Sequence, residues 1–165
     1  MSIIAKAVLS APRIYIFAKG ESYLAGCIFR NNLLKLDRHV TMADDGGLQT
    51  LHVKNGRPGD LFLFLSYSGI HYDYSKYAAA LSERGIKPCL ITAFSDSALA
   101  RQCDTVLLIP KSERVIGKVA NYSSMVSLTY TLQVIYSLIF NQDYQENYRV
   151  KHEADSFIFT SFAEI

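Results

Sequence analysis

Several features that would place a protein in a specialised class are missing from this chain of 165 residues. Its three cysteines, Cys27, Cys89 and Cys103, lie far apart in apolar surroundings, which is typical of buried free thiols in a reducing compartment. No apolar run reaches the length of a membrane span, and the N-terminus lacks the pattern of a cleaved signal peptide. We therefore expect a cytoplasmic protein without membrane contact.

Motifs for nucleic-acid, metal and nucleotide binding are missing as well. With a net charge of +2 and no cluster of lysine or arginine, the chain has no stretch suited to binding DNA. Cysteines and histidines do not have the spacing of a metal site, and no Walker lysine-serine pair occurs. Residues 18–22 also lack the second and third glycines of a Rossmann loop. The sequence therefore predicts neither a metal nor a cofactor.

What is present is the composition of one globular domain with a substantial core, since 50% of the residues are apolar and 19% are charged. Strand-like runs alternate with helical patterns along the chain. The strands are expected at 13–18, 38–42, 61–65, 86–92 and 105–109, and the main helices at 23–36, 48–54, 74–84 and 119–140. Each connection is long enough for a crossover, so we expect a three-layer α/β/α sandwich with a five-stranded parallel sheet. Its switch point should lie beside the first strand.

The two ends of the chain have distinct patterns. Residues 1–11 form a short helical stretch that Pro12 stops, and they resemble the end of a longer helix. The helix at 119–140 is more apolar than one face of a sheet requires, and residues 156–162 are apolar enough to need covering. Because soluble monomers rarely expose patches of that size, we expect a homodimer or a tetramer.

Small polar residues follow two of the predicted strands. Ser66, Ser68 and Gly69 come directly after the apolar strand at 61–65, and a Gly-Glu-Ser loop that ends in Ser22 follows the first strand. Parallel strands end at the same edge of a sheet, so these hydroxyls and the N–H groups of two helix starts should meet in one crevice. Serines in either loop alone could simply cap helices. The two loops together favour a phosphate site.

These loops resemble the SIS (sugar isomerase) family, in which a strand leads into Gly-x-Ser and a later strand leads into Ser-x-Ser-Gly-x-Thr. The resemblance covers residues 12–140 and implies a flavodoxin-like SIS fold. It implies that Ser22, Ser66 and Ser68 bind the phosphate of a sugar, and that Gly20 and Gly69 let the backbone approach it.

The chain departs from the family pattern at two positions. Ala18 stands where the family usually has a glycine, and His71 stands where it has threonine. The histidine could donate a hydrogen bond to the phosphate, with an added charge when it is protonated, or it could face solvent on the helix. Both interpretations of His71 stay open at this point.

Among SIS proteins, the chain is most similar to the effector domain of RpiR-type transcription regulators. The segments that carry this similarity are R-I-Y-I-F-A-K-G-E-S and G-K-V-A-N-Y-S-S-M-V-S-L. The similarity implies a single domain that binds a phosphorylated sugar or amino sugar, with a linker-like helix at 1–11, a core at 12–140 and an extension at 141–165. Contact with DNA would need a helix-turn-helix domain, which these residues do not contain.

A sugar-phosphate isomerase is the alternative, because the same fold can move a proton between two carbons of a phosphosugar. That reaction needs a positioned base, for which Glu113, His39, His52 and His71 are available. Glu113 precedes the long helix, roughly where SIS isomerases carry a carboxylate, although a solvated or ion-paired residue is the simpler interpretation. Tyr67 and Tyr72 could cover a sugar or serve only in packing. Since nothing in the spacing requires a base, we favour binding without turnover.

Overall fold

A computed structural model describes the backbone of residues 1–163 and the side chains of residues 1–157. Its centre is a parallel sheet of five strands in the order β2-β1-β3-β4-β5. The strands are β1 (Ile14–Ala18), β2 (Val40–Met42), β3 (Leu61–Leu65), β4 (Cys89–Thr92) and β5 (Thr105–Leu108). The strand order reverses between β1 and β3, as expected, so a crevice opens at their carboxyl ends.

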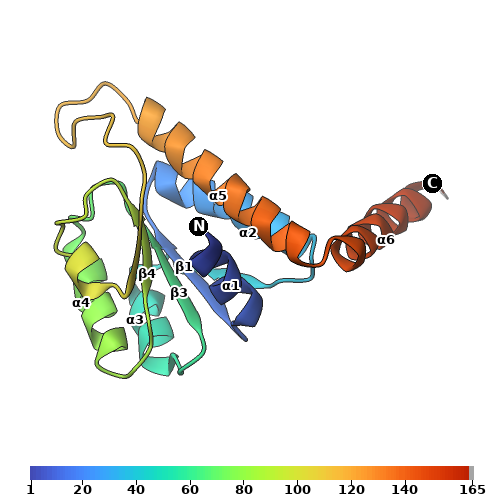
Figure 1. Cartoon of the computed structure of the whole chain (residues 1–165), viewed down its shortest axis with the longest axis horizontal. Coiled ribbons are helices and arrows are strands. Elements are labelled where there is room, and N and C mark those ends of the chain that lie inside the picture. The colour runs from blue at the N-terminus through green and yellow to red at the C-terminus, as the bar shows by residue number, and fades with distance from the viewer. Residues whose placement is uncertain (164–165) are drawn as a thin grey trace.

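Helices cover both faces of the sheet and complete the predicted three-layer sandwich (Figure 1). One face carries α1 (Ser2–Ser10), α2 (Glu21–Leu34) and α5 (Tyr122–Gln142). The other carries α3 (Gly46–Asn55), α4 (Tyr72–Ser82) and the short 3₁₀ helix η1 (Ala100–Gln102). Helix α6 (Tyr144–Ala163) follows α5 and extends away from the sandwich (Figure 1). The fold class predicted from the sequence is therefore confirmed.

The apolar run of β3 is continuous because helices lie on both sides of this strand. Leu61, Leu63 and Leu65 pack into the core under α1, α2 and α5. Phe62 and Phe64 point to the opposite face and pack into the core under α3 and α4. Alternate side chains of a strand point to opposite faces, so a central strand needs apolar residues at every position.

Two boundaries differ from the sequence-based prediction for local reasons. Strand β4 begins at Cys89, later than predicted, because Pro88 has no N–H to donate to a neighbouring strand. Helix α5 begins at Tyr122, later than predicted, because the residues before it form an irregular segment that Tyr67 binds through the main chain of Glu113. The second difference affects function, since this segment forms a wall of the candidate site.

Although the sequence has no uninterrupted apolar run of membrane-spanning length, helix α5 as a whole has the length and mean hydropathy that such a helix would need. In this fold its inner face is a core face, because Leu128, Leu132, Ile135 and Ile139 are buried against the sheet and the neighbouring helices. Helix α1 packs on the same layer, with Ile4 and Val8 buried in that core. Whether residues 1–11 act as a linker stays a prediction.

The cysteines are free thiols, as predicted, although only Cys89 is fully buried. Cys27 and Cys103 are partly buried, which corrects the prediction for those two residues. Of the predicted apolar segment at 156–162, the side chains of residues 158–162 lie outside the described part of the structure.

Candidate functional site

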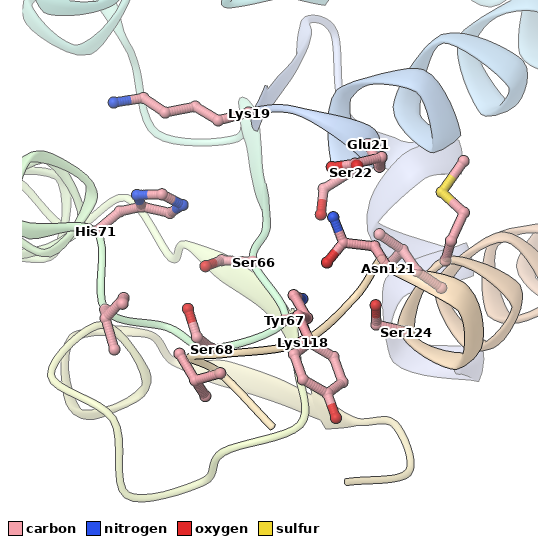
Figure 2. Close-up of a pocket in the computed structure, with 14 residues that line it drawn as sticks. Lys19, Glu21, Ser22, Ser66, Tyr67, Ser68, His71, Lys118, Asn121 and Ser124 are labelled. Atoms are coloured by element: carbon pink, nitrogen blue, oxygen red, sulfur yellow. The ribbon is translucent and has the colours of Figure 1, made fainter. Parts of the chain in front are cut away.

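A pocket of about 190 Å³ opens at the carboxyl ends of β1 and β3 (Figure 2). Four segments form it: the loop after β1, the loop after β3, the irregular segment before α5, and the first two turns of α5. The lining residues are Lys19, Glu21, Ser22, Ser66, Tyr67, Ser68, Ile70, His71, Val115, Lys118, Asn121, Ser124, Met125 and Leu128. The pocket therefore lies at the switch point of the sheet, where open parallel sheets bind ligands.

The loop after β3 curls so that its two serines lie beside the pocket. Ser66 is buried, and its Oγ accepts a hydrogen bond from the N–H of Gly69 at 3.1 Å. Gly69 has a φ of +64°, and a Cβ at this position would lie 2.1 Å from Oγ of Ser97. Only glycine fits this turn without strain. Ser68, which lies between them, has a partly exposed side chain that lines the pocket (Figure 2).

Three helix N-termini meet at the pocket. Gly20 precedes the first residue of α2, with a φ of 57°, and Ser22 lies in the first turn. His71 precedes α4, and Asn121 precedes α5. The first N–H groups of a helix have no partner within the helix, and they carry its partial positive charge. The arrangement therefore supplies both hydrogen-bond donors and a field that attracts an anion.

One side of the pocket is formed by Lys19 and His71, which both lie against Tyr74. The ammonium nitrogen of Lys19 is 5.3 Å from the centre of the Tyr74 ring, and the His71 ring centre is 5.3 Å from the same point. Burial lowers the pKa of His71, and the charge of Lys19 lowers it further. A neutral His71 offers one ring N–H as a donor. It lines the pocket and is partly buried, which favours the donor interpretation over a solvent-facing one.

Glu113 has a different environment from the one a catalytic base requires. Its carboxylate accepts hydrogen bonds from the N–H of Ser124 at 2.9 Å, from Oγ of Ser124 at 2.7 Å and from Oγ of Ser123 at 3.0 Å. Burial raises the pKa of Glu113, but these hydrogen bonds outweigh burial and lower it to about 2. Such a carboxylate is a weak base at neutral pH, and it stabilises the first turn of α5 as a helix cap does.

The remaining candidates from the sequence are divided between the pocket and other surfaces. Tyr67 lines the pocket, whereas Tyr72 is 70% exposed on α4 and does not. His39 lies near Asp37 before β2, and the ring of His52 on α3 packs against Tyr15. Neither histidine lines the pocket.

Sequence reasoning missed five polar residues that line this pocket: Lys19, Glu21, Lys118, Asn121 and Ser124. Lys19 and Glu21 flank Gly20, so their position in the predicted loop was a usable signal. Lys118 and Asn121 lie in the segment before α5, where no periodic pattern of apolar residues indicates which way a side chain points. Within residues 1–157, no group of three histidine, cysteine or acidic side chains is arranged to hold a metal ion.

Comparison with known proteins gives a family match and several related enzymes. The family model for the SIS domain matches residues 8–139. The glutamine–fructose-6-phosphate aminotransferase [isomerizing] of Halalkalibacterium halodurans is 35% identical over 107 residues, which are 63% of this chain and 17% of the enzyme. The enzyme of the same name from Streptococcus pneumoniae R6 is 32% identical over 130 residues, which are 75% of this chain and 21% of the enzyme. The chain thus spans about a fifth of the length of these relatives.

Solved structures share the fold at lower identity. The sugar isomerase domain of an RpiR transcription factor from Sphaerobacter thermophilus has a TM-score of 0.80 and 23% identity, covering 94% of this chain and 84% of its own. NanR of Vibrio vulnificus, complexed with ManNAc-6P, has a TM-score of 0.84 and 19% identity. The match covers 96% of this chain and 60% of the NanR chain. A protein of Escherichia coli CFT073 in complex with A5P has a TM-score of 0.72 and 17% identity. The match covers 86% of this chain and 77% of that protein's chain.

Proposed function

Because the chain belongs to the SIS domain family, we propose that its pocket binds a phosphorylated sugar or amino sugar. The observation that carries this proposal is the convergence of Ser22, Ser66 and Ser68 with the N-termini of α2 and α4. A phosphate has three acceptor oxygens, and hydroxyl and backbone donors can satisfy them without a metal. In this proposal Gly20 and Gly69 let the backbone approach the ligand, and His71 adds a side-chain donor.

The same domain is proposed to sense an effector in a regulator of carbohydrate metabolism. Support comes from the likeness to the RpiR factor and to NanR, whose structure was solved with ManNAc-6P. In such a protein, DNA contact would belong to a helix-turn-helix domain outside these 165 residues, and the setting would be cytoplasmic. The assembly would be a homodimer or a tetramer, because apolar side chains of the neighbouring helices α2 and α5 are exposed.

A thermal-shift panel tests the binding proposal. Hexose and pentose phosphates should raise the melting temperature, and the same sugars without phosphate should not. An equal response to both sets, or to neither, contradicts a phosphate site.

Ser68→Ala sharpens this test. Replacing Ser68 with alanine should weaken the binding of the phosphosugar by about 1–3 kcal/mol, the range for a hydrogen bond to a charged group. Ser137→Ala, at an exposed position near the other end of α5, is the matched control and should bind as the unmodified protein does. Equal affinities of the two variants would remove Ser68 from the site.

Isomerisation is the second candidate, and the sequence relatives named as isomerizing enzymes favour it. The position of Glu113 speaks against it, since its carboxylate is held by serines and does not line the pocket. NMR in deuterated solvent, run on the phosphosugar that stabilises the protein, separates the two functions. We expect binding without deuterium exchange at C1 and C2. Exchange that disappears in Glu113→Gln would make the protein an isomerase.

A further inference from the structure

Lys118 lies beside the loop that is proposed to bind the phosphate. Its side chain lines the pocket, and Figure 2 shows it between the loop of Ser66 and Ser68 and the start of α5. The ammonium nitrogen of Lys118 is 5.4 Å from the centre of the Tyr67 ring, and Tyr67 is the residue between those two serines. Lys19, the other lysine of the lining, lies over a ring of α4 instead. Lys118 is therefore the lysine that a phosphate on this loop would meet.

Glu113 holds Lys118 only loosely. The ammonium nitrogen of Lys118 is 3.5 Å from Oε2 of Glu113, whereas a hydrogen bond between an ammonium group and a carboxylate is about 2.7–2.9 Å long. The carboxylate already accepts hydrogen bonds from Oγ of Ser123 and from the N–H and Oγ of Ser124. Burial raises the pKa of Glu113, but these bonds outweigh burial and lower it to about 2. Glu113 therefore stays ionised at neutral pH and keeps its hydrogen bonds when Lys118 moves away.

The backbone around Lys118 is lightly packed. Between Glu113 and the start of α5, the side chain of Ile116 is 86% exposed and that of Val119 is 96% exposed. Gly117, which directly precedes Lys118, has a φ of +73°, and a Cβ at this position would meet nothing within 4 Å. Segments with few buried apolar contacts rearrange at low cost in free energy. Lys118 can therefore change its partner without disturbing the core.

We propose that Lys118 is the counter-ion of the bound phosphate. When the ligand binds, the ammonium group of Lys118 exchanges the carboxylate of Glu113 for the phosphate, and residues 114–120 close over the pocket with it. A phosphate ester carries a charge of about −1.5 to −2 at neutral pH and has three acceptor oxygens. It is a stronger partner for the ammonium group than a carboxylate that is already hydrogen-bonded to serines. The inference rests on the proposed phosphosugar site and adds a cation and a closing segment to it.

Isothermal titration tests the contact between Lys118 and the phosphate. The ligands are inorganic phosphate and the hexose and pentose phosphates of the thermal-shift panel, glucose 6-phosphate and ribose 5-phosphate among them. Inorganic phosphate has no sugar, so its affinity reports on the phosphate contact alone. Lys118→Gln should weaken the binding of each ligand that the unmodified protein binds by at least about tenfold. Lys118→Arg, which keeps the charge, should restore most of the affinity.

Lys111→Gln is the matched control. It removes the same charge from the same segment, at an exposed lysine that lies over the ring of Phe94 and does not line the pocket. It should change each affinity by less than about twofold, because salt screens an exposed charge.

Hydrogen exchange tests the closure. A saturating ligand should slow exchange in residues 114–120 of the unmodified protein and of Lys111→Gln, but not in Lys118→Gln. Without ligand, Lys118→Gln should melt at the temperature of the unmodified protein, because Ser123 and Ser124 keep Glu113 in place.

The possible outcomes separate the role of Lys118 from the phosphosugar site itself. Equal affinities of Lys118→Gln and the unmodified protein, or equal losses in Lys118→Gln and Lys111→Gln, overturn the role of Lys118 and leave the site standing. A lower melting temperature of Lys118→Gln without ligand gives Lys118 a structural role instead. Slowed exchange that persists in Lys118→Gln overturns the closure. If none of the ligands binds the unmodified protein, the proposed function falls and this inference falls with it.

Discussion

The hydroxyl of Tyr67 holds the main chain of Glu113 from both sides, because it accepts the N–H of Glu113 at 2.8 Å and donates to its carbonyl oxygen at 3.1 Å. Tyr67 lies between Ser66 and Ser68, the two serines of the loop after β3. Glu113 in turn binds the first turn of α5 through Ser123 and Ser124. Two walls of the pocket are thus joined through one phenol.

Tyr67→Phe should loosen the segment before α5 while keeping the ring in place. Two hydrogen bonds are lost, so we expect a decrease of about 1–3 kcal/mol in the free energy of unfolding. Urea unfolding measures this decrease, and hydrogen exchange should show faster exchange in residues 111–121. Tyr72→Phe is the control, because that ring is exposed on α4. Unchanged exchange in residues 111–121 would show that Tyr67 does not hold this segment.

Gly69→Ala should destabilise the protein more than Gly85→Ala. Both glycines have positive φ, +64° and +71°, but a Cβ at Gly85 meets nothing within 4 Å, whereas one at Gly69 approaches Ser97. Holding alanine in a left-handed backbone conformation costs about 1–2 kcal/mol in both variants. Overpacking against Ser97 adds about 1–3 kcal/mol at Gly69 alone. Thermal or urea unfolding of the two variants compares them directly. Equal losses would mean that the loop after β3 adapts to a side chain.

Glu113 should contribute to stability in a defined range of pH. The pKa of its carboxyl falls from the ordinary 4.5 to about 2 in the folded chain, so the folded state binds fewer protons than the unfolded state between these values. The contribution is complete above about pH 4.5 and is lost as the pH falls toward 2. At pH 7, Glu113→Gln should cost about 1–3 kcal/mol, the range for hydrogen bonds to a charged group.

The comparison of unfolding curves from pH 7 to pH 2 tests this. The difference between Glu113→Gln and the unmodified protein should shrink below about pH 4.5 and approach zero near pH 2. Taking the difference removes the contribution of other acidic groups. A constant difference across the whole range would show that the charge of Glu113 is not what stabilises α5.

The exposed apolar side chains of α5 and α2 should lie in a subunit contact. Val126 is 69% exposed and Tyr130 67%, and Leu24 and Ile28 of the neighbouring helix α2 are also exposed. Light scattering at micromolar concentration should give a dimer or tetramer mass, and Val126→Lys should give the mass of a monomer. Leu51→Lys on α3, which covers the opposite face, should not change the mass. A monomer mass for the unmodified protein would remove this prediction.

The sequence could predict the sheet because its strands are buried on both faces. In a run such as that of β3, apolar and polar residues do not alternate, which is typical of a strand covered on both faces. Helical patterns between such runs indicate crossover connections and therefore parallel strands. The start of α5 could not be predicted in the same way, since the capping contact comes from Glu113, which lies outside the helix and is fixed by Tyr67. A cap supplied from another segment leaves no local signal.

The candidate site was predictable where loops follow strands. Ser22, Ser66 and Ser68 could be placed together because β1 and β3 end at the same edge of the sheet. Lys118 and Asn121 could not be placed at the site from the sequence. The path of the irregular segment before α5 depends on contacts with Tyr67 and Glu21 that only the folded chain provides. Glu113 was placed near the site by its position before α5, but its hydrogen bonds to serines were not visible in the sequence.

The pairing of β1 with β3 also determines what a melting curve of this protein can measure. At the opposite end of these strands, Arg13 binds the carboxylate of Asp60, a residue 47 positions away in the chain. Contacts between residues this far apart in the chain slow folding, because a long loop must close before they form. Until they form, Ser22 and Ser66 belong to separate stretches of coil, and a phosphosugar has no site on the unfolded chain. A ligand then acts by mass action on the native state alone, with about 2.7 kcal/mol of stabilisation at a hundred times its dissociation constant. The size of a thermal shift can therefore be converted into an affinity.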